Sequence, residues 1–121
     1  QAAPYIQYAA VRANSILRKS ENGLPDQTAL SYELTPVEVE LIDLISRVPR
    51  EIQRSAAECK PLFISNLAFD LAQAFNNFYH QCPVLQAEPP VRDYRLRLAA
   101  AARQTMINCL ALLGIDSPEI M

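Results

Sequence analysis

The sequence predicts an all-α fold, a single-domain bundle of about five helices. Half of its 121 residues are hydrophobic, whereas only two are glycine and none is tryptophan. Alanine and leucine favour helices and are abundant here, while alternating runs of β-branched residues are scarce. A chain of this length buries roughly two-thirds of the surface that its unfolded form would expose, which suffices for one core. We therefore expect one domain over residues 1–121.

The first helix is expected from Tyr5 to Lys19, and an exposed connection follows it. Apolar side chains recur along one side of this helix, at Ile6, Val11, Ile16 and Leu17. The connection, residues 20–34, contains the sequences NG and LPD, and these residue types favour turns over helix.

The second helix is expected over residues 36–47, with a defined start. Thr35 can cap it, proline suits its first position, and Glu38 stands three residues after the cap, as a capping box requires. Proline lacks an N–H and disrupts a helix interior. Pro49 therefore predicts a break, followed by a short third helix over residues 49–60.

The two remaining helices are long. The fourth, from Leu62 to about His80, is the most apolar, and three-four spacing predicts that it is central. Its expected core residues are Phe63, Leu67, Leu71, Ala74, Phe75 and Phe78. The fifth runs from about Val91 to Leu113, after a proline-rich loop. Gly114 suits a left-handed helix stop, and residues 116–119 can start one terminal turn.

Composition argues against several protein classes. The three cysteines lie far apart with no CxxC spacing, which indicates reduced thiols in a cytoplasmic protein. With a single histidine, no metal site is expected. No apolar run approaches the roughly 18 residues of a membrane span, and no charged-then-apolar leader precedes the first helix, so no membrane partner is expected. The opening residues, QAAP, suggest a fragment of a longer chain.

The charges are unevenly distributed, although the net charge is only −2. Residues 20–46 contain six acids and no base, and the rest of the chain contains eleven bases and seven acids. An acidic protein with this asymmetry can still carry one basic face. Ordinary solvated helix faces explain the same pattern. We expect the acidic stretch to face away from any nucleic acid.

No catalytic residues are expected. Two glycines cannot form a phosphate-binding loop, and the single imidazole, His80, lacks a nucleophile and an orienting partner. Arginines and aromatics remain: Arg92, Arg95 and Arg103 fall near one face of the last helix, on the outside of the bundle. Arginine binds phosphate and stacks on bases, and single-stranded RNA is bound through aromatic stacking and base-edge hydrogen bonds.

Three functions stay open on these residues alone. One is RNA binding by the arginines and aromatics, and another is a helical protein-interaction module without RNA binding, which composition favours. The third is a small helical enzyme whose arginines converge on a dianionic substrate, as in chorismate mutase.

Three separated stretches carry a family resemblance. The sequences YIQYAAVRANSILRK (residues 5–19) and NLAFDLAQAFNNFYHQCPVL (residues 66–85) resemble the first and central helices of the C-terminal domain of arginyl-tRNA synthetases. The sequence LLGIDSPEIM (residues 112–121) is similar to the end of those chains, which finish in methionine. The terminal pattern argues against the related helical domains of the cysteine and glycine enzymes.

The resemblance implies an all-helical anticodon-binding domain of the DALR type, as in class I synthetases. The parent enzyme would join arginine to its tRNA with ATP and magnesium, through catalytic and N-terminal domains that are absent here. This domain would hold no cofactor. Its partners would be the anticodon loop of an arginine tRNA and the parent's own catalytic domain. We expect a monomer.

The resemblance also implies four RNA-binding residues. Tyr79 would stack on or support an unstacked anticodon base, Pro83 would shape the pocket wall, and Met121 would close the pocket. The Met121 carboxylate, if terminal, could accept from the amino group of the cytosine at the middle of arginine anticodons. Arg12 would contact backbone phosphate. Family members often have histidine where this chain has Ala10, so a polar contact at that position is not expected.

Overall fold

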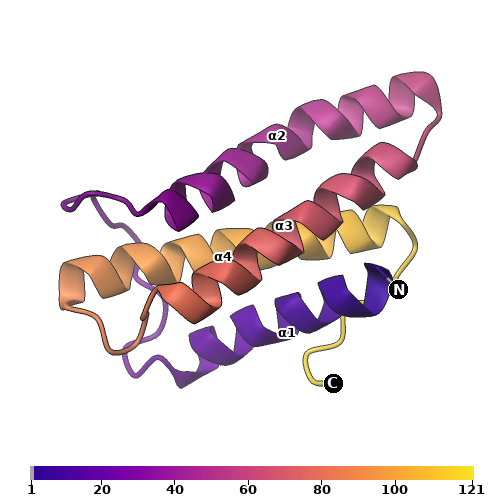
Figure 1. Ribbon diagram of the computed structural model, residues 1–121. Coiled ribbons are helices and arrows are strands. Elements are labelled where there is room, and N and C mark those ends of the chain that lie inside the picture. Colours follow the sequence, from indigo (N-terminus) through magenta and orange to yellow (C-terminus); the bar gives the residue numbers. More distant parts are fainter. Residues whose placement is uncertain (1) are drawn as a thin grey trace.

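Four helices account for most of the computed structural model, which describes residues 2–121. They are α1 (Ala2–Lys19), α2 (Pro36–Glu58), α3 (Leu62–Gln81) and α4 (Pro89–Leu112). Figure 1 shows them as one bundle, in which α1, α3 and α4 lie together and α2 lies along the other side of α3. No strand occurs within residues 2–121, so the predicted all-α class is confirmed.

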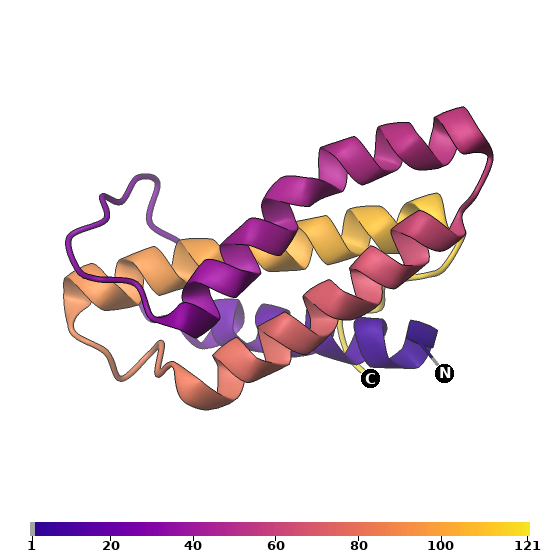
Figure 2. The same ribbon diagram turned by 45° about the horizontal axis from the view of Figure 1, so that its top comes forward.

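The expected count of about five helices was one too high. Residues 36–58 form a single helix, and Pro49 lies inside it. Proline removes one helical hydrogen bond and disturbs the preceding turn, and Figure 2 shows α2 changing direction partway along its length. Leu44 and Val48, before the proline, are buried, and Ile52, after it, packs partly buried against the same core. Burial on both sides of Pro49 therefore outweighs the local break.

The ends of the helices mostly follow the expected chemistry. The Thr35 side chain accepts from the backbone N–H of Glu38 at 3.3 Å, and the Glu38 carboxylate accepts from the backbone N–H of Thr35 at 2.9 Å. The predicted capping box is thus confirmed. Gly114, just after α4, has φ +74°, the left-handed conformation that suits glycine. Residues 116–119 do not form the expected helical turn.

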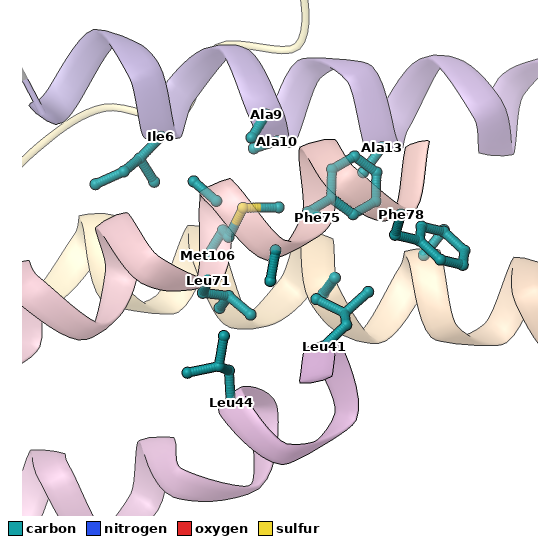
Figure 3. Packing of buried hydrophobic residues seen from close by; sticks show 14 of the residues in the cluster. Ile6, Ala9, Ala10, Ala13, Leu41, Leu44, Leu71, Phe75, Phe78 and Met106 are labelled. Atoms are coloured by element: carbon teal, nitrogen blue, oxygen red, sulfur yellow. The ribbon is translucent and has the colours of Figure 1, made fainter. Parts of the chain in front are cut away.

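The core lies where α3 is enclosed by the other helices. Leu71, Phe75 and Phe78 of α3 are fully buried, as are Met106 and Leu110 of α4. The buried residues that α1 contributes are mostly small: Ala9, Ala10 and Ala13 face the large side chains of its neighbours (Figure 3). Small residues let helices approach closely, so α1 runs close beside α3 and α4. Ala10 points into this core.

None of the four described helices is long and apolar enough to cross a membrane. Over residues 2–121, no group of three or more His, Cys, Asp or Glu side chains lies close enough together to hold a metal ion.

Candidate nucleic-acid interface

An exposed group of one arginine and two tyrosines lies where α1 passes the last turns of α3. The guanidinium carbon of Arg12 lies 5.0 Å from the ring centroid of Tyr79 and 5.9 Å from that of Tyr8, both cation–π distances. Arg12 Nη1 donates to Asn76 Oδ1 at 3.1 Å, which holds the guanidinium against α3. Tyr8 and Tyr79 are 57% and 42% exposed, so the group presents aromatic surface to solvent.

The helical spacing of α3 explains why Tyr79 is exposed. Phe75 and Phe78 are fully buried, and the residue after Phe78 is rotated by about 100° around the helix. The Tyr79 ring still lies 6.5 Å from the ring of Phe75 and 5.3 Å from that of His80, between centroids. The Tyr79 ring therefore packs against Phe75 and His80, while part of it remains exposed to solvent.

A surface hollow, named here the Tyr79 hollow, begins beside this ring and has a volume of about 350 Å³. Small-ligand sites occupy ~300–1,000 Å³. Three of its lining residues come from α1, one from α3 and five from the turn that follows α3. These residues are Ser15, Ile16, Lys19, Tyr79, Cys82, Pro83, Val84, Leu85 and Gln86. The hollow thus combines an aromatic edge, a cationic edge and polar side chains.

A smaller hollow of about 140 Å³ adjoins it. Lys19 and Leu85 line both hollows, and Arg92 lines the smaller one. Glu21 and Asn22, from the acidic stretch of residues 20–46, also line the smaller hollow. Two residues of that stretch therefore line the smaller hollow, and the expectation that the stretch faces away from nucleic acid stays a prediction.

The four predicted RNA-binding residues fall into two groups. Tyr79 and Pro83 line the Tyr79 hollow, and Arg12 is in contact with the Tyr79 ring. Met121 is not among the residues that line this hollow. It ends the tail after α4, which passes behind α1 in the view of Figure 1 and is bonded to it, because Gln7 Nε2 donates to the Asp116 carbonyl at 2.7 Å. The Met121 side chain is 54% exposed.

The wall of the Tyr79 hollow is attached to a buried ion pair. Arg95 of α4 is only 8% exposed, so the expectation that it lies on an outer face was wrong. Its Nε donates to Glu38 Oε2 at 3.0 Å, and its Nη2 donates to Glu38 Oε1 at 3.3 Å. Its Nη1 donates to the carbonyl of Pro83 at 2.8 Å. The single guanidinium thus joins α4, the start of α2 and the turn that walls the hollow.

The residues before α2 complete this buried cluster. The Tyr32 hydroxyl donates to Glu38 Oε2, and the Tyr32 ring lies 5.6 Å from the Arg95 guanidinium carbon. Thr35 Oγ1 and Cys82 Sγ are 3.6 Å apart, so the cap of α2 also touches the turn. No side-chain nitrogen or oxygen buried among the described residues lacks a hydrogen-bond partner.

The pKa values of the cluster indicate a charged pair beside a neutral tyrosine. Burial alone would raise the pKa of Glu38, but hydrogen bonds from Arg95 and Tyr32 outweigh it and hold the pKa below the ordinary glutamate value. Burial alone would lower the pKa of Arg95, but the bond to Glu38 outweighs it and raises the pKa above the ordinary arginine value. The pKa of Tyr32 is raised, first by burial and then by its bond to Glu38.

Three features of this surface were not predicted from the sequence. Tyr8 stands four residues before Arg12, which places both side chains on one helix face, so its spacing could have indicated the contact. Lys19 is the last residue of the same helix, so its charge and position could have indicated a cation near this surface. The bond between Glu38 and Arg95 spans 57 residues and leaves no local signal.

Residues 6–121 match the family model described as the DALR anticodon binding domain. The arginine–tRNA ligase of Pyrococcus abyssi is 44% identical over 100% of this chain and 20% of its own length. That of Haloarcula marismortui is 38% identical over 100% of this chain and 21% of its own.

A solved structure shows the same fold. Thermus thermophilus arginyl-tRNA synthetase superposes with a TM-score of 0.89 at 35% sequence identity, and the match covers 98% of this chain and 21% of that one. The chain spans about a fifth of the length of the relatives it matches. On the match over residues 6–121, this chain belongs to the family of DALR anticodon binding domains.

Proposed function

We propose that this chain is the anticodon-binding domain of an arginine–tRNA ligase, and that the Tyr79 hollow receives an unpaired base of the anticodon loop. The main support is the position of Tyr79, exposed and stacked with Arg12 at the edge of a hollow that Pro83 also lines. The family match favours this function over a helical interaction module without RNA binding.

Stacking supplies the affinity in this proposal. An aromatic ring that stacks on an unpaired base contributes ~1–3 kcal/mol in single-strand binders. Tyr79 is 42% exposed, which leaves part of its ring free for such a base, and Arg12, 5.0 Å from the ring centroid, would contact the phosphate beside that base. Lys19, at the other edge of the hollow, offers a second cation to the RNA backbone.

Polar groups of the hollow supply base preference. Gln86 and Ser15 line it, and a glutamine amide offers both an acceptor and donors to a base edge. The middle cytosine of arginine anticodons presents an amino group that such an acceptor can bind. We propose that Met121 contacts RNA that lies beside α1, because the tail that carries Met121 is attached to α1 by the bond from Gln7 to Asp116.

The rest of the enzyme enters only as a proposal. The relatives are about five times longer than this chain, and we place arginine, ATP and magnesium chemistry in that larger part. The partners of this domain are then an arginine tRNA and the catalytic domain of its own enzyme. We propose a monomeric protein of the cytoplasm.

The proposal is tested by titrating the chain with a labelled anticodon stem-loop of an arginine tRNA at two salt concentrations. A stem-loop with an altered middle base is the comparison ligand. We expect weak, salt-dependent binding that prefers the natural base, because the full enzyme would hold the tRNA through several domains.

Two variants of one residue separate stacking from structure. Tyr79→Ala should weaken binding by ~1–3 kcal/mol and remove most of the base preference, while Tyr79→Phe should retain both because it keeps the ring. Thermal unfolding of each variant reports its stability. A Tyr79→Ala chain that binds and discriminates like wild type would refute the assignment. Absence of salt-dependent binding in wild type would favour the interaction module.

A further inference from the structure

The turn that forms one wall of the Tyr79 hollow is bonded to a buried side chain that does not line the hollow. We propose that Arg95, paired with Glu38, is a positioning residue for base selection: it fixes Pro83 and thereby the shape of the site. This inference rests on the proposed function, because it concerns how the same hollow distinguishes bases.

The geometry of Arg95 supports a positioning role. All three of its side-chain nitrogens donate, two to the Glu38 carboxylate and one to the Pro83 carbonyl. A guanidinium is planar and rigid, so the two bonds to Glu38 fix the direction of the third. Pro83 has no N–H of its own, so its carbonyl is its one backbone hydrogen-bonding group.

The other end of the ion pair is held by residues at and before the start of α2. Glu38 completes the capping box of α2, in which its carboxylate accepts from the Thr35 backbone. The same carboxylate accepts from Tyr32. The position of the hollow wall thus depends on the start of α2, although α2 contributes no side chain to the hollow itself.

Energetics separate positioning from simple stabilisation. Replacing both members of a buried ion pair by uncharged residues of similar size is often neutral or stabilising for the fold, whereas removing one partner alone is strongly destabilising. A paired replacement can therefore keep the fold while it releases Pro83. If the pair serves only stability, that replacement should leave base selection unchanged.

Two variants release Pro83 in different ways. Arg95→Lys keeps a positive charge beside Glu38, but a lysine ammonium cannot span both carboxylate oxygens and the Pro83 carbonyl in a fixed geometry. The double variant Arg95→Met/Glu38→Gln removes both charges, and glutamine can still complete the capping box. The matched control is Tyr32→Phe, which removes one bond to Glu38 and leaves the Arg95–Pro83 bond in place.

Two measurements are made on each variant of the 121-residue chain. The first is the ratio of dissociation constants for stem-loops with the natural and the altered middle base. The second is the alkylation rate of each cysteine by iodoacetamide, resolved by peptide mass spectrometry. Cys82 lies in the turn and is 3% exposed, Cys109 is fully buried in the core, and Cys59 is exposed. Cys82 therefore reports opening of the turn, and Cys109 reports opening of the core.

We expect Arg95→Lys and the double variant to reduce the base preference about three- to tenfold, the effect of one lost hydrogen bond. Both should accelerate alkylation of Cys82 and leave the Cys109 rate unchanged. Tyr32→Phe should retain the wild-type preference and the wild-type Cys82 rate. If the double variant does not fold, Arg95→Lys decides the question alone.

Two results would overturn the inference. One is wild-type preference and a wild-type Cys82 rate in Arg95→Lys. The other is an equal loss of preference in Tyr32→Phe, which would make the cluster a general support. A wild-type chain without base preference would instead contradict the proposed function. In that case the Cys82 rates still show whether Arg95 fixes the wall.

Discussion

The Tyr79 hollow and a hollow between α2 and α4 are similar in size but differ in chemistry. The second, about 290 Å³, is named here the α2–α4 hollow and is lined by Ile42, Ile45, Tyr94, Arg97, Leu98 and Ala101. All these residues belong to two helices. The Tyr79 hollow instead draws on two helices and a turn, and it adjoins an arginine that lies within cation–π distance of two exposed tyrosines. Volume alone would not distinguish a base-binding site from an apolar surface depression.

The two hollows also differ in how their walls are held. The α2–α4 hollow lies between helix surfaces, whose backbones are fixed by their own hydrogen bonds. The wall of the Tyr79 hollow is a turn, and side chains from α2 and α4 hold it through the Glu38–Arg95 pair. A turn can present a proline and several side chains to a ligand, but it needs such an attachment to keep one shape.

The largest expected effect concerns that attachment. Glu38→Ala leaves Arg95 buried without its counter-charge, and breaking a buried pair in this way costs about 3–5 kcal/mol. Asp43→Ala breaks the exposed pair with Arg47 on the same helix, and exposed pairs contribute at most about 1 kcal/mol. Urea unfolding of both variants gives the free energies. Equal losses in the two variants would show that the cluster is no stronger than a surface pair.

Acid should weaken the same attachment by a smaller amount. The folded-state pKa of Glu38 lies below its unfolded value, so its contribution is complete above the ordinary glutamate pKa and is lost as the pH falls through the folded pKa. Arg95 and Tyr32 are the groups that face it.

The pH dependence is measured from urea midpoints between neutral and acid pH. The difference between wild type and Glu38→Gln should shrink as the pH falls, because protonation leaves the wild-type side chain uncharged as well. A difference that stays constant over this range would contradict the assigned direction of the pKa shift.

The smallest expected effect concerns the salt dependence of RNA binding at the two hollows. Lys19→Gln removes a cation from the Tyr79 hollow, and Arg97→Gln removes one from the α2–α4 hollow. One lost phosphate contact lowers the slope of log affinity against log salt by about 0.7 for single strands. Titration with the stem-loop should show this decrease for Lys19→Gln and wild-type slopes for Arg97→Gln. The reverse result would move the RNA to the other face.

The fold was predictable wherever the apolar spacing was regular. The spacing of Phe75 and Phe78 identified α3, and the capping box identified the start of α2. The same reasoning failed at Pro49, where a local rule predicted a break but burial of Val48 and Ile52 on one face kept the helix continuous. Propensity is a weak guide where tertiary packing opposes it.

The candidate site was predictable only in part, for a related reason. Tyr79 and Pro83 are near in sequence, so a stretch of residues could indicate both. From the sequence, Arg95 looked like a surface arginine, because its own helix offers no hydrogen-bond acceptor for a buried guanidinium. Its partners, Glu38 and Pro83, come from other segments, and only their folded arrangement accounts for its burial.

The long separation between Glu38 and Arg95 has a consequence for the order of assembly. During synthesis, α1 and α3 leave the ribosome before residue 95 does, so the stack of Arg12 on Tyr79 has both its members available first. The wall of the Tyr79 hollow cannot be held by Arg95 until α4 has emerged. A nascent chain can thus display the aromatic surface of Arg12 and Tyr79 before Arg95 holds the turn beside it.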